Sequence, residues 1–165
     1  MLPNELAMNN AVTFKKAYDV LYEQFHIAEL QVDTDSQVVT NDIALLFVPL
    51  IVNGTFACEL FLKSLLPQET GESCEHDLKK LYTSPDMKQN IKDGIANCVV
   101  TIMQNFKHDY DARQFHTDIK KNKDNYDNWR YFHENKKESI KADFLFIHYL
   151  MQVLFDICLT ERGTK

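Results

Sequence analysis

Apolar residues recur at intervals of three and four along most of the chain, which is the spacing of amphipathic α-helices. The first stretch places Leu6, Phe14, Tyr18, Leu21 and Phe25 on this pattern. The pattern predicts long helices from residue 4 or 10 to about 30, from 40 or 41 to 66, from 84 to about 106 and from about 138 to 158, with a short helix over 75–82. We therefore expect an all-α fold.

Helix-breaking residues are few. The 165 residues include four glycines and four prolines, too few for a fold built on many tight turns. The length fits one domain. We expect a single domain over 1–165, with a core over about 10–160 and a polar, basic-aromatic loop region over 107–137. Its fold class is expected to be an up-and-down helical bundle of four long helices plus one short helix.

Two helix starts carry recognisable residue types. Ser84, followed by a proline, is expected to cap the helix that begins there. In the short helix, Asp77 suits the positive end of the helix dipole, and Ser73 or Glu75 could provide the cap. Capping and packing explain the pair formed by His76 and Asp77 about as well as a functional role does.

Charge is distributed unevenly along the chain. The formal net charge is −6, yet residues 113–141 carry eight basic and five acidic residues. Aromatic residues lie among them: Phe115, Tyr126, Trp129, Tyr131 and Phe132. Basic residues interleaved with aromatic ones are typical of single-stranded nucleic acid sites. The alternative is a solvated, lysine-rich loop with a few anchoring aromatics.

Cysteine usage and the N-terminal residues favour a cytoplasmic protein. The four cysteines are widely spaced and the first residues lack the pattern of a signal peptide, so we expect reduced thiols. The apolar run Ile43–Val52 is ten residues long, well short of a membrane span, and no membrane association is expected. The nearest approach to a metal motif is Cys74-x-His76 with one of His108, His116 or His133. This spacing matches no zinc motif, so neither metal nor cofactor is expected.

Charged residues inside apolar surroundings are the candidates for chemistry. Glu59 and Lys63 stand one helical turn apart in an apolar stretch. Because burying either ion is costly unless it is paired, they form a structural ion pair or part of a polar pocket. Arg130 lies among aromatics, four residues before Glu134. Its guanidinium could hold a carboxylate or phosphate at two points, or tie its segment to Glu59 or Asp77.

Three segments, taken together and in order, carry a family resemblance. They are Glu-Leu-Phe-Leu-Lys-Ser-Leu-Leu (59–66), His-Asp-Leu-Lys-Lys-Leu-Tyr (76–82) and Trp-Arg-Tyr-Phe-His-Glu (129–134). Over roughly residues 40–160, this arrangement resembles the HEPN superfamily of small helical proteins. The resemblance implies a helical bundle that forms a homodimer and binds RNA or a nucleotide. It also implies a role in bacterial stress, toxin–antitoxin or defence systems.

The resemblance further implies a polar groove. Its residues would be Glu59, Lys63, His76, Asp77, Trp129, Arg130, Tyr131, His133 and Glu134. Within it, Lys63 and Arg130 would contact phosphate, and Trp129 or Tyr131 would stack on a base. The ligand could be RNA or a nucleotide.

The histidine spacing departs from that of the ribonucleases in this superfamily, which carry arginine, four to six residues, then histidine. Here Arg113 precedes His116, and Arg130 precedes His133, by three positions, so standard HEPN ribonuclease activity is not expected. If the chain is an enzyme, it is a metal-independent endoribonuclease with His76 or His133 as the acid–base catalyst. The alternative is a non-catalytic protein-interaction module whose polar residues form a structural network and whose function lies in a partner protein.

Overall fold

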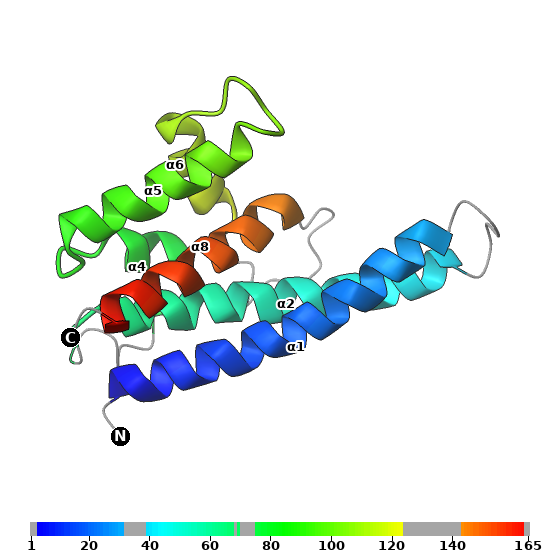
Figure 1. Cartoon of the computed structure of the whole chain (residues 1–165), viewed down its shortest axis with the longest axis horizontal. Coiled ribbons are helices and arrows are strands. Elements are labelled where there is room, and N and C mark those ends of the chain that lie inside the picture. Colours follow the sequence, from blue (N-terminus) through cyan, green and yellow to red (C-terminus); the bar gives the residue numbers. More distant parts are fainter. Residues whose placement is uncertain (1–2, 32–38, 68, 70–74, 124–142, 164–165) are drawn as a thin grey trace.

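The computed structural model describes the backbone of residues 3–31, 39–67, 69, 75–123 and 143–163, and the side chains of 4–25, 46–67, 69, 75–123 and 143–163 (Figure 1). These residues form six α-helices and no strand. The helices are α1 (Pro3–Gln31), α2 (Val39–Leu65), α4 (Leu78–Thr83), α5 (Gln89–Met103), α6 (Ala112–Lys121) and α8 (Phe144–Gly163). The predicted all-α class is confirmed for this part of the chain. Four helices are long, as predicted, but two rather than one are short.

The helices pack as a bundle. α1 and α2 make the most extensive contact, and they run antiparallel along most of their length (Figure 1). α8 packs against α2 and α5, while α4 and α6 contact each other and bridge α2 to α5. The core between these helices is a single cluster of apolar side chains contributed by all six. This packing leaves α1 along one edge of the molecule, with a face that no other helix covers in Figure 1.

A close contact between α1 and α2 depends on a glycine. A Cβ added at Gly54 would lie 3.0 Å from ring atoms of Tyr18, so any larger residue would press on this fully buried ring. The Tyr18 hydroxyl lies 2.8 Å from Nδ1 of His148 in α8. Burial raises the pKa of Tyr18 and lowers the pKa of His148. Both groups are therefore neutral, and the hydroxyl donates to an unprotonated Nδ1, which ties α8 to α1.

Three helices begin later than their sequences predicted. α8 starts at Phe144 rather than near 138, and it ends at Gly163 rather than at 158. α4 starts at Leu78 rather than at 75, because Asp77 is its N-cap and not a first-turn residue; its carboxylate accepts hydrogen bonds from the Lys79 and Lys80 amides. α5 starts at Gln89 rather than near Ser84. The Ser84 hydroxyl oxygen instead accepts a hydrogen bond of 3.3 Å from the backbone N–H two residues on. A side-chain oxygen that satisfies a local amide stabilises a turn as readily as a helix start.

The predicted loop region over 107–137 contains a helix in its described part. α6 is capped by Asp111, whose carboxylate accepts from the backbone N–H groups of Arg113 and Gln114. It buries Phe115 and Ile119 four residues apart on one face. The helix was not predicted because the segment is mostly polar and has only these two apolar residues on one face. Their burial is enough to anchor a ten-residue helix.

Two helical segments are long and apolar enough to cross a membrane, judged by length and composition: Leu46–Leu65 and Phe144–Gly163. Core helices of soluble proteins meet the same criterion, and both segments contribute to the apolar core. The expected absence of membrane association and the expected cytoplasmic location stay predictions.

Candidate polar site around His76

Glu59, Lys63 and His76 form one hydrogen-bonded cluster. Lys63 Nζ lies 2.8 Å from Glu59 Oε1, and His76 Nδ1 lies 3.0 Å from Oε1 and 3.1 Å from Oε2. The Glu59 side chain is 1% exposed and the His76 side chain 44% exposed. The structure therefore brings together three of the predicted site residues, with the carboxylate inside and the imidazole at the surface.

The segment before α4 fixes the position of His76. Asp77 Oδ1 accepts hydrogen bonds of 2.8 and 3.0 Å from the backbone N–H groups of Lys79 and Lys80. On the other side of the histidine, the Glu75 carboxylate accepts from the Asp77 backbone N–H at 3.1 Å. These bonds hold the backbone on both sides of His76, so the ring is placed over Glu59 by a folded segment.

Three ion pairs link lysines to the carboxylates of the site. Lys63 pairs with Glu59, Lys80 with Glu75 at 3.1 Å, and Lys123 with Asp77 at 3.6 Å. Each of these carboxylates thus has a lysine partner, so a protonated imidazole would add positive charge at the surface, where it attracts an anion.

The pKa of Glu75 reflects its two contacts. Desolvation alone would raise the pKa of this carboxyl, but the hydrogen bond and charge of Lys80, together with the backbone amides of Asp77 and His76, lower it below the ordinary value. Glu75 is therefore ionised at neutral pH, and it remains an acceptor for the amide that precedes α4.

The geometry of the cluster has a chemical consequence for His76. An ionised carboxylate only accepts hydrogen bonds, so the neutral ring carries its hydrogen on Nδ1. A histidine held in this way can bind an anion when it is protonated. Glu59 and Lys63 orient it from inside the bundle.

Thr55 is a buried polar residue that the sequence analysis did not single out. It lies one helical turn before Glu59 on α2, is fully buried, and its hydroxyl has no hydrogen-bond partner within the described part of the chain. The pattern Thr55, Glu59, Lys63 repeats every four residues and could have been found as a polar stripe on an apolar helix.

The remaining predicted site residues lie outside the described residues: Trp129, Arg130, Tyr131, His133 and Glu134. The structure therefore places only the predicted groove residues of α2 and of the segment before α4, and the groove itself stays a prediction. Arg113 and His116 are both exposed on α6, three residues apart on the same helix. Within the described ranges, no group of three or more His, Cys, Asp or Glu side chains is placed to hold a metal ion.

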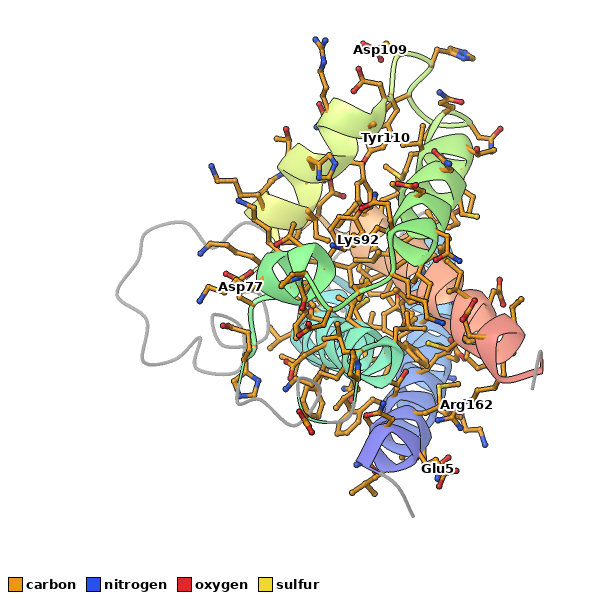
Figure 2. All side chains as sticks on the ribbon, turned by 90° about the vertical axis from the view of Figure 1, so that its left-hand side faces the viewer. Glu5, Asp77, Lys92, Asp109, Tyr110 and Arg162 are labelled. Carbon is orange, nitrogen blue, oxygen red and sulfur yellow. The ribbon has the colours of Figure 1, made fainter. Side chains whose placement is uncertain are left out.

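Two surface clefts lie elsewhere. One, of about 560 Å³, opens at the end of the bundle where Asn4 and Glu5 meet Arg162; Figure 2 shows Glu5 and Arg162 together there and Asp77 away from them. The other, of about 370 Å³, lies between α4, α5 and α6 and includes Lys92. Neither cleft is lined by Glu59, Lys63 or His76, so the described clefts and the polar cluster are different candidate sites. We favour the polar cluster because its side chains are oriented by specific bonds.

The contact between Lys123 and Asp77 was also not predicted. The two residues are 46 positions apart, and the backbone of Leu78 also donates to the Lys123 carbonyl at 3.2 Å. A contact at this separation depends on the packing of α6 against α4, which no local pattern encodes. Comparison of the chain with family models, with curated proteins and with solved structures finds no match.

Proposed function

We propose that the chain is a HEPN-like helical domain that binds the phosphate groups of RNA or of a nucleotide at the surface around His76, without standard HEPN ribonuclease activity, in a bacterial stress, toxin–antitoxin or defence setting. The observation that carries this proposal is the imidazole of His76, half-exposed and held by the buried Glu59 carboxylate. The order of the three sequence segments supports the family part of the proposal.

The charges around His76 suit a phosphate. A protonated imidazole donates charge-assisted hydrogen bonds to phosphate oxygens. Lys80 and Lys123 pair with the residues on either side of His76, Glu75 and Asp77, and their side chains are 67% and 39% exposed. The Lys80–Glu75 pair is exposed and worth less than about 1 kcal/mol, so Lys80 can turn to a phosphate at small cost. The buried Glu59–Lys63 pair need not be broken.

The absence of standard ribonuclease activity is proposed from spacing. Arg113 and His116 are one turn apart on α6, whereas the ribonucleases of the superfamily separate arginine and histidine by four to six residues. An incubation of the protein with mixed-sequence RNA in the absence of metal tests this part. Cleavage above background that disappears in His76→Ala would contradict it and would make His76 a catalytic residue.

The binding part is tested by fluorescence anisotropy with labelled single-stranded RNA of mixed sequence and, separately, with a labelled adenine nucleotide. We expect His76→Ala to weaken binding by about tenfold, the loss of one charge-assisted hydrogen bond. Its melting temperature should fall by only a few degrees, because the bond to Glu59 is lost while Lys63 still neutralises the carboxylate. His116→Ala, which removes an exposed histidine from α6, is the matched control and should bind normally. Absence of binding to either probe, or equal binding by wild type and His76→Ala, would refute the proposal.

A second function is favoured by a specific observation, the burial of Glu59 and Lys63. Both are enclosed and bond to each other, as expected of a structural network in a non-catalytic protein-interaction module. Under this alternative neither RNA nor the nucleotide binds, while replacing Lys63 still destabilises the fold. The anisotropy experiment therefore separates the two functions, and the homodimer that the resemblance implies is common to both.

A further inference from the structure

The longest helix, α1, has a buried apolar face and an opposite exposed face that carries both apolar and polar residues. One face of α1 enters the core through Met8, Ala11, Tyr18 and Phe25. On the opposite face Val20 is 62% exposed and Leu6 is 53% exposed, two of the large apolar side chains most open to solvent in the described residues. Single exposed apolar side chains are common on protein surfaces, so the spacing of the whole exposed face has to be considered.

The exposed face follows a coiled-coil spacing. Its members are separated alternately by four and three residues: Leu6, Asn10, Thr13, Ala17, Val20 and Gln24, all exposed. In heptad terms Leu6, Thr13 and Val20 occupy d positions and the other three occupy a positions. At the centre of the stripe the adjacent a and d residues, Ala17 and Val20, are both apolar, so two helices can approach closely there.

We propose that α1 pairs with α1 of a second copy of this chain in an antiparallel arrangement about a twofold axis between residues 18 and 19. In this register Ala17 packs beside Val20 of the partner subunit, and the axis repeats the contact with the roles exchanged. Residues whose numbers add to 37 then stand at the same level. A twofold axis makes such an interface self-complementary, as most homodimer interfaces are.

Charge on the flank of the stripe selects this register. Lys16 and Glu23, seven residues apart at the g positions, are both exposed, and no ion pair is formed by either within the described residues. In the antiparallel register Lys16 lies within about 3 Å, measured along the axis, of the level of Glu23 of the partner subunit. The axis produces the reciprocal pair, so the flank carries two interchain ion pairs of opposite charge. Charges at g positions set the orientation of coiled coils in this way.

A parallel pairing lacks this complementarity. In a parallel pair, each g residue faces the residue five positions later in the partner helix. Lys16 would then face a leucine and Glu23 an alanine, so neither charge would be paired. The second flank of the antiparallel seam is formed by Phe14 and Leu21, which are half-buried and apolar. The seam from Thr13 to Gln24 is only about 18 Å long, so we expect a weak dimer that dissociates on dilution.

Sedimentation velocity over a wide range of protein concentrations tests the proposal, with no nucleic acid present, so its outcome is independent of RNA or nucleotide binding. We expect a monomer–dimer equilibrium in the wild type. Lys16→Glu and Glu23→Lys should each raise the dimer dissociation constant at least about tenfold, because two attractive contacts become two repulsive ones. The double variant Lys16→Glu with Glu23→Lys should restore the wild-type constant within about threefold.

Two further variants control for the face involved. Val20→Asp should abolish dimerisation, whereas Leu159→Asp, at an exposed apolar position of α8, should leave it unchanged. Circular dichroism melting confirms that each variant is folded, as expected for exposed positions. A monomer at every concentration would overturn the proposal. The proposal would also be overturned if the single charge reversals left the dimer dissociation constant unchanged, if the double variant did not restore it, or if Leu159→Asp abolished the dimer.

Discussion

Replacing Lys63 by methionine removes the ammonium group that neutralises a buried carboxylate. Lys63 Nζ is 2.8 Å from Glu59 Oε1, and the two side chains are 10% and 1% exposed. Methionine keeps most of the apolar stem, so the change in packing is small. The substitution therefore isolates the electrostatic consequence of leaving Glu59 inside the bundle with His76 as its remaining side-chain partner in the described structure.

The expected loss of unfolding free energy is about 3 kcal/mol, at the lower end of the range for breaking a buried pair. The lower end applies because His76 still donates to the carboxylate. For a chain of this size that loss lowers the melting temperature by roughly 6–12 °C. The double variant Glu59→Leu with Lys63→Met removes both charges, and it should lie within about 1 kcal/mol of the wild type because no ion is left buried.

Urea denaturation followed by far-ultraviolet circular dichroism measures these free energies. Lys15→Met is the matched control: Lys15 also pairs at four-residue spacing, at 2.7 Å, but its partner Asp19 is 46% exposed. The control should lose less than about 1 kcal/mol. If Lys63→Met costs no more than Lys15→Met, or if the double variant is less stable than Lys63→Met alone, the argument that Glu59 is a buried ion held by Lys63 is wrong.

Three further predictions concern the fold. Gly54→Ala should lower the free energy of unfolding by about 1–3 kcal/mol because its Cβ would meet the Tyr18 ring. A Cβ at Gly94 would lie 3.9 Å from the nearest side chain, so Gly94→Ala should stabilise α5 by up to about 1 kcal/mol. Equal effects of the two substitutions in urea denaturation would contradict this contrast. Desolvation lowers the pKa of His148 below the ordinary 6.5 in the folded protein, so on acidification the unfolded chain takes up this proton first. The free energy of unfolding should therefore fall as the pH drops below 6.5, by less than about 1.4 kcal/mol per pH unit for this partly solvated ring. His148→Asn, which keeps an acceptor for Tyr18, should show a shallower fall, and an unchanged pH profile would argue against this assignment. Asp77→Ala should cost about 1 kcal/mol by removing the α4 cap, and a melt within error of the wild type would show that the cap is dispensable.

The long helices could be predicted from sequence because their apolar spacing is sustained over many turns. Both limits of α2 and the end of α1 were expected within two residues of those observed, and of the two predicted starts of α1, residues 4 and 10, the first is correct to one residue. α6 was missed because its ten residues carry only Phe115 and Ile119 as an apolar stripe, inside a strongly polar segment. The start of α5 was misplaced by five residues because Ser84 has the residue type of a cap and uses it in a turn. Caps are identified by geometry, and residue type alone does not distinguish a turn from a helix start.

Part of the candidate site could also be predicted. The spacing of Glu59 and Lys63 was sufficient to predict an ion pair, since residues four apart share one face of a helix. The contact of His76 with Glu59 joins positions 17 residues apart across the α2–α4 connection, and only the family resemblance placed them in one groove. The burial of Thr55 and the Lys123–Asp77 pair depend on how whole helices pack, which the local sequence does not specify.

The site divides into an inner part and an outer part, and the two proposed functions differ in which part matters. Glu59 and Lys63 are enclosed, so substitutions there report on stability under either function. The His76 side chain is half-exposed, so its substitution removes little packing. It costs the bond to Glu59, about 1 kcal/mol, and otherwise reports on contacts with a ligand or partner. A His76→Ala variant that stays folded at the assay temperature but loses RNA or nucleotide binding would assign the outer part to phosphate recognition. The same variant, stable and indistinguishable from a wild type that binds neither probe, would leave the cluster as a structural network and direct the search to a partner protein.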